Sequence, residues 1–169
     1  APRASVLDVG SGSGVKSKYL FARGFHVTGV DFSEKLAEIA KREVPRVDFI
    51  VMDIHDLENL HEMYDGVFAQ AVLLHFAKKD VPAIFQKLAD KVKPQGYLYV
   101  AVKERREGDA EEEIKKEDDY GYPCERFFSY FNIGEIETYF KKAGLNIVYA
   151  VREPFKSTAW LQVIGQRKL

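Results

Sequence analysis

The sequence of 169 residues contains a single cysteine, a single tryptophan and two methionines. One cysteine, Cys124, excludes an intramolecular disulfide and any zinc site built from several cysteines. No apolar run reaches the roughly 18 residues that a membrane-spanning helix requires, and the basic-then-apolar start of a signal peptide is missing. These absences predict a soluble, cytoplasmic protein.

The sequence also lacks an excess of charge of either sign. Lys and Arg number 25 and Asp and Glu number 26, so the formal net charge is −1. This balance gives no overall attraction to nucleic acid or to an anionic membrane, although it allows a local basic patch. Hydrophobic residues make up 46% and charged residues 30%, an ordinary globular composition. A chain of this size buries about 70% of its unfolded surface, so we expect a single domain, residues 1–169.

Short apolar runs alternate with amphipathic stretches, which is the pattern of an α/β domain with a mainly parallel sheet. Strands are predicted at residues 5–9, 25–30, 47–52, 66–72 and 97–102, the last one after a turn at residues 94–96. Helices are predicted at residues 15–23, after Ser33 with Leu36, Ile39 and Ala40 as its apolar face, near residues 57–63, and after a capping Asp80.

The composition changes after residue 103. Residues 104–119 hold nine acidic and four basic residues, which predicts a solvated loop or a short polar helix within a charged insertion of about residues 104–122. Asn132 and Glu135 form the pattern of a capping box for a helix that Gly144 closes. The last two strands, residues 145–151 and 159–165, are joined by a loop containing Pro154. That loop is too short for a parallel crossover, so the two strands are expected to be antiparallel.

The segment most informative about chemistry is VLDVGSGSG, residues 6–14, where a strand runs into a glycine-rich turn and then a helix. Backbone amides at the start of such a helix face a ligand, and glycine keeps side chains out of its way. Asp31 and Asp53 end the next two strands. With Asp8 they put three carboxylates at the carboxyl ends of successive strands, where open α/β sheets bind ligands.

Two cofactor classes compete for this arrangement. A nicotinamide or flavin dinucleotide would place its pyrophosphate beside the Asp8 carboxylate, which is unfavourable. The glycines at 10, 12 and 14 also give GxGxG, whereas the dinucleotide pattern GxGxxG would need a glycine in place of Val15. S-adenosylmethionine (SAM) has an ammonium and a sulfonium but no phosphate, so acidic residues attract it. The charges therefore favour SAM.

Over essentially its whole length the chain resembles class I SAM-dependent methyltransferases, especially small bacterial-type members. The resemblance lies in VLDVGSGSG, in KPQGYL at residues 93–98, in the Arg-Phe-Phe-x-Tyr segment at 126–130 and in the terminal Trp160-Leu161. It implies a Rossmann-like three-layer sandwich around a mostly parallel seven-stranded sheet of order 3-2-1-4-5-7-6, with strand seven antiparallel. Such enzymes normally carry one or two helices before the first motif. Here the first strand begins within six residues of Ala1, so those helices are absent from this sequence, and either they were removed or the protein lacks them.

The resemblance also implies the cofactor contacts. Asp31 would bind the ribose hydroxyls and Asp53 the adenine amino group, with Phe32 and Ile54 on either side of the adenine. The glycine turn would pass the methionine moiety, bordered by the fourth strand, and S-adenosylhomocysteine (SAH) would be the product. The expected cofactor-binding residues are Asp8, Gly10, Ser11, Gly12, Asp31, Phe32, Met52, Asp53, Ile54, Gln70 and Ala71.

On the acceptor side, methyl transfer is an in-line displacement for which the protein mainly supplies alignment and excludes water. A general base is needed only if the acceptor must lose a proton. His75, just past the fourth strand, is the candidate for that base or is a structural residue beside the cofactor. The expected acceptor-binding residues are His75, Tyr122, Arg126 and Tyr130, and Arg126 could instead pair with a nearby acid. The four histidines show no close ligand spacing, so no metal site is expected.

The expected function is transfer of the SAM methyl group to an unidentified, small-molecule acceptor by direct displacement. A tRNA or other nucleic-acid methyltransferase is the first alternative, and the net charge and the acidic segment disfavour it. Binding of tRNA that weakens steeply with salt would support that alternative. The second is a non-catalytic SAM-binding module, which methyl transfer to any acceptor would exclude. The sequence does not give the oligomeric state.

Overall fold

The computed structural model describes residues 3–117, 123–155 and 158–169. Within these residues the main strands are β1 (Ser5–Val9), β2 (His26–Asp31), β3 (Asp48–Val51), β4 (Tyr64–Gln70), β5 (Val92–Lys103), β8 (Leu145–Phe155) and β9 (Thr158–Arg167). The helices are α1 (Val15–Ala22), α2 (Glu34–Glu43), α3 (Val81–Asp90) and α4 (Ile133–Lys142). Two short 3₁₀ helices, η1 (Ile54–Asn59) and η2 (Leu73–His75), follow β3 and β4.

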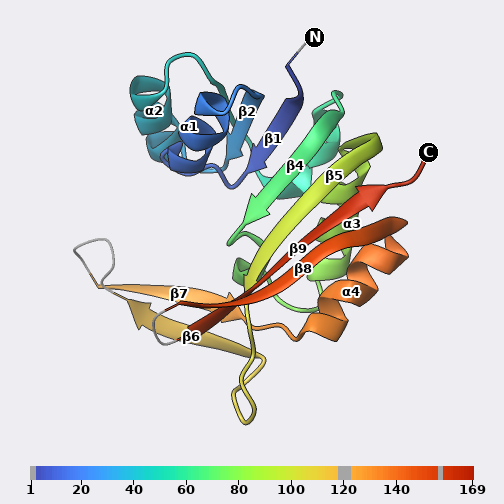
Figure 1. Cartoon of the computed structure of the whole chain (residues 1–169). Helices are drawn as coiled ribbons and strands as arrows, with labels where there is room; N and C mark the ends of the chain where they lie inside the picture. The colour runs from blue at the N-terminus through green and yellow to red at the C-terminus, as the bar shows by residue number, and fades with distance from the viewer. Residues whose placement is uncertain (1–2, 118–122, 156–157) are drawn as a thin grey trace.

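The described main strands form one seven-stranded sheet in the order β3-β2-β1-β4-β5-β9-β8 (Figure 1). β1 to β5 pair in parallel, whereas β9 is antiparallel to both β5 and β8. This confirms the predicted strand order and the antiparallel seventh strand. Strands six and seven of the prediction are β8 and β9, because a separate two-stranded sheet precedes them in the chain.

Helices lie on both faces of the sheet. Since successive residues of a strand point to opposite sides, one strand packs against helices on both faces. On β2, Val27 joins a small cluster with Ala40 of α2, while Val30 belongs to the main core. α3 and α4 pack together on the main-core face, where the rings of Phe85 and Phe140 meet edge to face. Figure 1 shows no described helix in front of β4, β5 and β9, so the third layer extends only over the β1 to β3 half of the sheet.

The two helix starts predicted by capping residues differ. Ser33 caps α2 as expected, since its Oγ accepts a hydrogen bond from the Leu36 amide at 3.4 Å. Asp80 precedes α3, but its side chain accepts no capping hydrogen bond from a described residue. The predicted apolar face of α2 is partly corrected: Ala40 is buried as predicted and Ala37 is buried beside it, whereas Leu36 is exposed and lines the cavity described below.

The predicted turn at residues 94–96 lies inside β5 rather than before it. β5 begins at Val92, which pairs with Tyr64, and the register with β4 then shifts before Gly66 pairs with Tyr97. Gln95 adopts a positive φ of 64°. These features are those of a β-bulge, which inserts residues into a strand without ending it.

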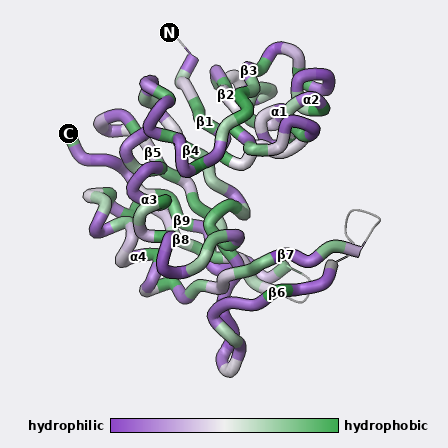
Figure 2. Tube along the Cα trace, turned by 180° about the vertical axis from the view of Figure 1, so that it is seen from behind, coloured by the Kyte–Doolittle hydropathy of each residue, from purple (hydrophilic) through white to green (hydrophobic). Residues whose placement is uncertain are grey.

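The charged segment contains a strand, which the sequence analysis did not predict. β6 (Glu112–Glu117) pairs antiparallel with β7 (Cys124–Ser129), and this hairpin projects from the main sheet (Figure 1). The register sets Glu113 opposite Phe128 and Ile114 opposite Phe127. Figure 2 shows the mostly hydrophilic course of β6. Its partner β7 contains aromatic residues, and the charges of β6 alone did not indicate that the two segments pair.

The end of the chain follows the prediction closely. Asn132 and Glu135 form the capping box of α4: Asn132 Oδ1 accepts from the Glu135 amide at 3.0 Å, and Glu135 accepts from the Asn132 amide at 2.8 Å. β8 and β9 form the predicted antiparallel hairpin. Both strands are longer than predicted, and Pro154 pairs with Ala159 inside the ladder instead of lying in the connection.

Candidate functional site

A cavity of about 670 Å³ opens at the carboxyl ends of β1 to β4, between the glycine turn and the β6–β7 hairpin. Parallel strands deliver their loops to this edge, which explains why residues far apart in sequence meet there. The predicted cofactor-binding residues on its wall are Gly10, Gly12, Asp31, Phe32, Met52, Asp53, Ile54, Gln70 and Ala71. Of the predicted cofactor-binding residues, all of which are described, Asp8 and Ser11 do not line the cavity.

The glycine turn is held against β2 by its own backbone. The amides of Gly10 and Ser11 both donate to the Val30 carbonyl oxygen, at 2.8 and 3.0 Å. A Cβ on Gly10 would come within 2.8 Å of the Val72 side chain, whereas a Cβ on Gly12 would meet no described atom within 4 Å. Gly10 is therefore required by packing. Gly12, with a φ of 53°, leaves its side open to the cavity.

Asp31 connects the turn to the start of α2. Its Oδ2 accepts from the Gly12 amide at 2.8 Å, and its Oδ1 accepts from the Ser33 amide at 2.9 Å. The carboxylate lines the cavity and is otherwise nearly buried. The residue predicted to bind a ligand thus also fixes the backbone of the glycine turn.

The cavity is also lined by Asp53 and by the exposed aromatic ring of Phe32. Asp53 caps η1 by accepting from the His55 amide at 2.9 Å, and this hydrogen bond is the main cause of its lowered pKa. Phe32, directly after Asp31, leaves 77% of its surface exposed while lining the cavity. A large aromatic side chain left open beside a cavity is typical of a binding surface.

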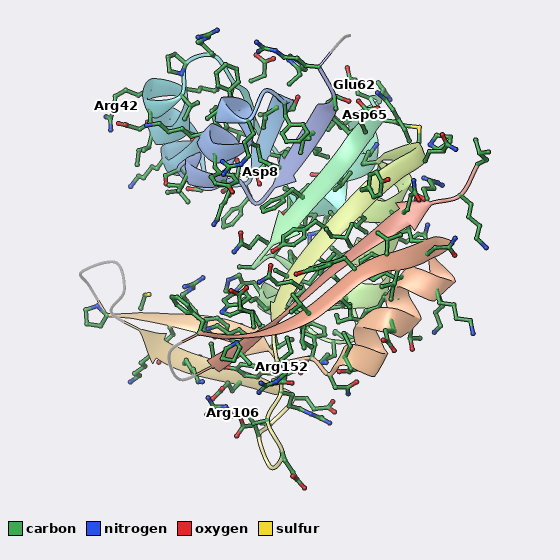
Figure 3. All side chains as sticks on the ribbon, viewed as in Figure 1. Asp8, Arg42, Glu62, Asp65, Arg106 and Arg152 are labelled. Carbon is green, nitrogen blue, oxygen red and sulfur yellow. The ribbon has the colours of Figure 1, made fainter. Side chains whose placement is uncertain are left out.

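Asp8 lies behind the turn rather than in the cavity. It is 2% exposed, at the end of β1 (Figure 3), and its Oδ2 accepts from Ser17 Oγ at 2.6 Å. Burial raises the pKa of Asp8 to about 6. Ser17 is the buried residue of α1, and the sequence analysis missed this partner because a serine in a short helix carries no hydrophobic signal.

The acceptor candidates separate in the structure. His75 and Arg126 both line the cavity, with Phe76 and Phe127 beside them, and the two aromatic residues were not predicted to do so. Tyr130 does not line the cavity: it is buried, and its ring stacks with that of Phe128 in the core. It follows the end of β7, where the chain turns inward. Tyr122 lies outside the described residues.

His75 and Arg126 are in direct contact. Arg126 donates from its guanidinium to Nε2 of His75 at 2.8 Å, and Nδ1 of His75 lies 3.0 Å from the Phe127 carbonyl oxygen. A guanidinium can only donate and a carbonyl can only accept. The His75 ring is therefore neutral and has its proton on Nδ1.

Residues 1–150 match a family model described as a methyltransferase domain. The chain belongs to this methyltransferase family. Curated relatives include the biotin biosynthesis bifunctional protein of Cellvibrio japonicus, 30% identical over 100 residues, and the ubiquinone biosynthesis O-methyltransferase of Dechloromonas aromatica, 31% identical over 105 residues. Each match covers 59% of this chain, but only 20% and 44% of those two proteins. The chain thus spans less than half the length of these relatives.

Solved methyltransferases share the fold. A SAM-dependent methyltransferase from Methanosarcina mazei superposes with a TM-score of 0.84 at 17% identity, covering 100% of this chain and 94% of that one. The 1,6-didemethyltoxoflavin-N1-methyltransferase of Burkholderia thailandensis, with its substrate and SAH bound, gives a TM-score of 0.77 at 22% identity. That match covers 99% of this chain and 72% of the other. At these identities the likeness concerns the fold.

The described part of this methyltransferase domain contains neither a candidate membrane-spanning helix nor a candidate metal site. No helix there is long and apolar enough to cross a membrane. No group of three or more His, Cys, Asp and Glu residues there could hold a metal ion.

Proposed function

We propose that this domain binds SAM in the cavity at the carboxyl ends of β1 to β4 and transfers its methyl group to a small-molecule acceptor by direct in-line displacement. The observation that carries the proposal is the meeting of Gly12, Asp31 and Phe32 on one cavity wall. Family membership and the functions for which the relatives are named agree with it. The ubiquinone and toxoflavin enzymes are named for small-molecule acceptors.

The residues present suit SAM better than a dinucleotide. Asp31 and Asp53 provide carboxylates on the wall for ribose hydroxyls and an adenine amino group, and Phe32 provides an open aromatic face for the adenine. Gly12 leaves room for the methionine part. Among the described lining residues, Arg126 has the permanent positive charge, and it comes from β7 rather than from the turn where a pyrophosphate would lie.

SAM supplies a methyl group already activated by its sulfonium, so the chain has to align the acceptor and exclude water. Val72, Phe76 and Phe127 give the acceptor end of the cavity an apolar lining. Asp31 ties the glycine turn to the start of α2 by accepting from the amides of Gly12 and Ser33. The site therefore acts mainly by positioning.

The test is a transfer assay with tritium-labelled SAM and a panel of phenols, catechols, aromatic acids and heteroaromatic amines, with bulk tRNA in a parallel reaction. The proposal predicts label transfer to at least one small molecule by the wild-type protein and a severe loss in the Asp31→Ala variant. Transfer to tRNA alone would contradict a small-molecule acceptor. Failure to label any member of either set would contradict a catalytic role.

A further inference from the structure

At the end of the cavity away from Asp31, two elements far apart in the chain meet. Phe76 and His75 come from η2 and its boundary, and Arg126 and Phe127 come from β7. Ser129 Oγ donates to the Phe76 carbonyl at 2.5 Å and so ties the hairpin to η2. The acceptor end of the cavity thus has two aromatic walls, one imidazole and one guanidinium.

The Arg126 to His75 contact opposes a catalytic role for the histidine. A general base needs an open lone pair, and in the neutral ring described above that lone pair is on Nε2. Arg126 occupies it at 2.8 Å. The base predicted from the sequence is therefore blocked by the neighbouring residue that was predicted to bind the acceptor.

The surroundings of Arg126 favour an anion. Its guanidinium carbon lies 5.3 Å from the centre of the Phe128 ring, and Lys103 Nζ lies 4.0 Å from the same ring. Two cations thus contact one ring, and Glu113 lies opposite the same residue on β6, where a hydrogen bond from Lys115 and, to a smaller extent, the charge of Lys103 lower the pKa of the Glu113 carboxyl. A carboxylate is also a stronger partner for a guanidinium than a neutral imidazole nitrogen, since it accepts two charge-assisted hydrogen bonds.

This inference rests on the proposed function. We propose that the acceptor is an aromatic compound with a carboxylate, that Arg126 binds the carboxylate, and that its departure from His75 Nε2 makes His75 the base. The acceptor heteroatom then forms a bond to the methyl carbon while the carbon–sulfur bond of SAM breaks. The sulfonium leaves as the neutral thioether of SAH, and the proton of the heteroatom passes to His75 Nε2. An acceptor without the anionic group leaves His75 blocked.

The first experiment measures the binding of two matched probes to the protein loaded with SAH. Benzoate and benzamide have the same shape, but benzoate has the carboxylate. Benzoate should bind at least about tenfold more tightly than benzamide. This ratio corresponds to about 1.4 kcal/mol, which a charge-assisted hydrogen bond can supply. Arg126→Gln should bring the two affinities within about twofold, and Arg126→Lys should keep part of the preference because it keeps the charge.

Arg152→Gln is the matched control. Arg152 pairs with Glu104 at 2.7 Å and does not line the cavity (Figure 3). This variant should keep the wild-type preference for benzoate. Equal binding of both probes to the wild-type protein, failure of both to bind, or an unchanged preference in Arg126→Gln would overturn the inference.

The second experiment follows the ring nitrogens of His75 by NMR in the same SAH-loaded protein. Benzoate should shift the Nε2 signal and raise the pH at which the ring takes up its second proton, whereas benzamide should do neither. A His75 signal that ignores benzoate would overturn the release of the base. A protein that binds no SAH would contradict the proposed function itself, so the two failures are distinguishable.

Discussion

At the residue scale, the carboxylate of Asp31 holds backbone amides in place as well as lining the proposed cofactor site. Its place after the second strand predicted a ligand contact, and the structure puts it on the cavity wall. Its oxygens also accept from the amides of Gly12 and Ser33, a contact that depends on the folded glycine turn. A variant of Asp31 therefore affects both binding and backbone order.

Asp31→Ala should weaken SAM binding more than tenfold, since charge-assisted hydrogen bonds are each worth about 1.5–3 kcal/mol. It should also lower the free energy of unfolding, because two amides lose their acceptor. Calorimetric titration with SAM and urea unfolding measure the two effects separately. Asp48→Ala, at the exposed start of β3, is the matched control and should change neither. A SAM affinity within about twofold of wild type would show that the cofactor placement is wrong.

The raised pKa of Asp8 predicts an unusual dependence of stability on pH. Its pKa is about 6 in the folded protein, against an ordinary value of 3.8, mainly because burial disfavours the charge. The folded state therefore binds this proton more readily than the unfolded state. The free energy of unfolding therefore decreases as the pH rises from about 4 to about 6. Above that range Asp8 is ionised in both states and causes no further decrease.

Asp8→Asn should remove that decrease, because the amide is uncharged and its oxygen can still accept from Ser17. At about 1.4 kcal/mol per pKa unit, the variant should be up to about 3 kcal/mol more stable than wild type at about pH 8. Near pH 4 the two proteins should have equal stability. Urea unfolding at both pH values measures this, and a difference that does not change with pH would contradict it.

At the element scale, local signals predicted what local interactions determine. The capping box of α4 and the Ser33 cap of α2 are hydrogen bonds between near neighbours, so the residue pattern sufficed. β6 depends on a partner strand, and its charges therefore suggested a loop. The same reason explains why Tyr130 was wrongly predicted to line the cavity and why Phe127 was missed. The side of this segment that faces the cavity depends on how the hairpin packs against η2, which alternation along the sequence does not determine.

The capping box offers a direct comparison with the cap that is missing at α3. Asn132→Ala should lower the free energy of unfolding by about 1 kcal/mol, since an amide at the start of α4 loses its acceptor. Asp80→Ala should change it much less, because the Asp80 side chain makes no capping hydrogen bond to a described residue. Thermal unfolding of both variants measures this, and equal losses would contradict the assignment.

The contact between α4 and β9 depends on Gly165. A Cβ there would overlap the ring of Phe140, which is fully buried. Gly165→Ala should therefore cost about 1–3 kcal/mol of stability by overpacking. Phe140→Leu should recover part of that loss when combined with it. Gly134→Ala in α4, where the nearest atom is 3.4 Å from the added Cβ, is the control and should be neutral or stabilising. Equal effects of the two alanines would contradict this contact.

At the scale of the whole molecule, the alternation of strands and helices predicted an α/β domain with a mainly parallel sheet. The strand order came from the resemblance to class I methyltransferases, and the structure has that order. That topology brings the ends of β1 to β4 together and makes the cavity. The acceptor end is different, since it depends on how the hairpin of β6 and β7 lies against η2. The carboxylates at the strand ends, the glycine turn and the resemblance together predicted most residues of the proposed cofactor wall. At the proposed acceptor end, only His75 and Arg126 were both predicted and found to line the cavity.

The central claim is that this cavity binds SAM. Calorimetric titration of the protein with SAM, SAH and NADH tests it most directly, because the three ligands share an adenosine and differ in phosphate and sulfonium. The account predicts binding of SAM and SAH with a Kd on the order of micromolar, about −8 kcal/mol, and no binding of NADH. Binding of NADH alone, or of none of the three, would contradict it.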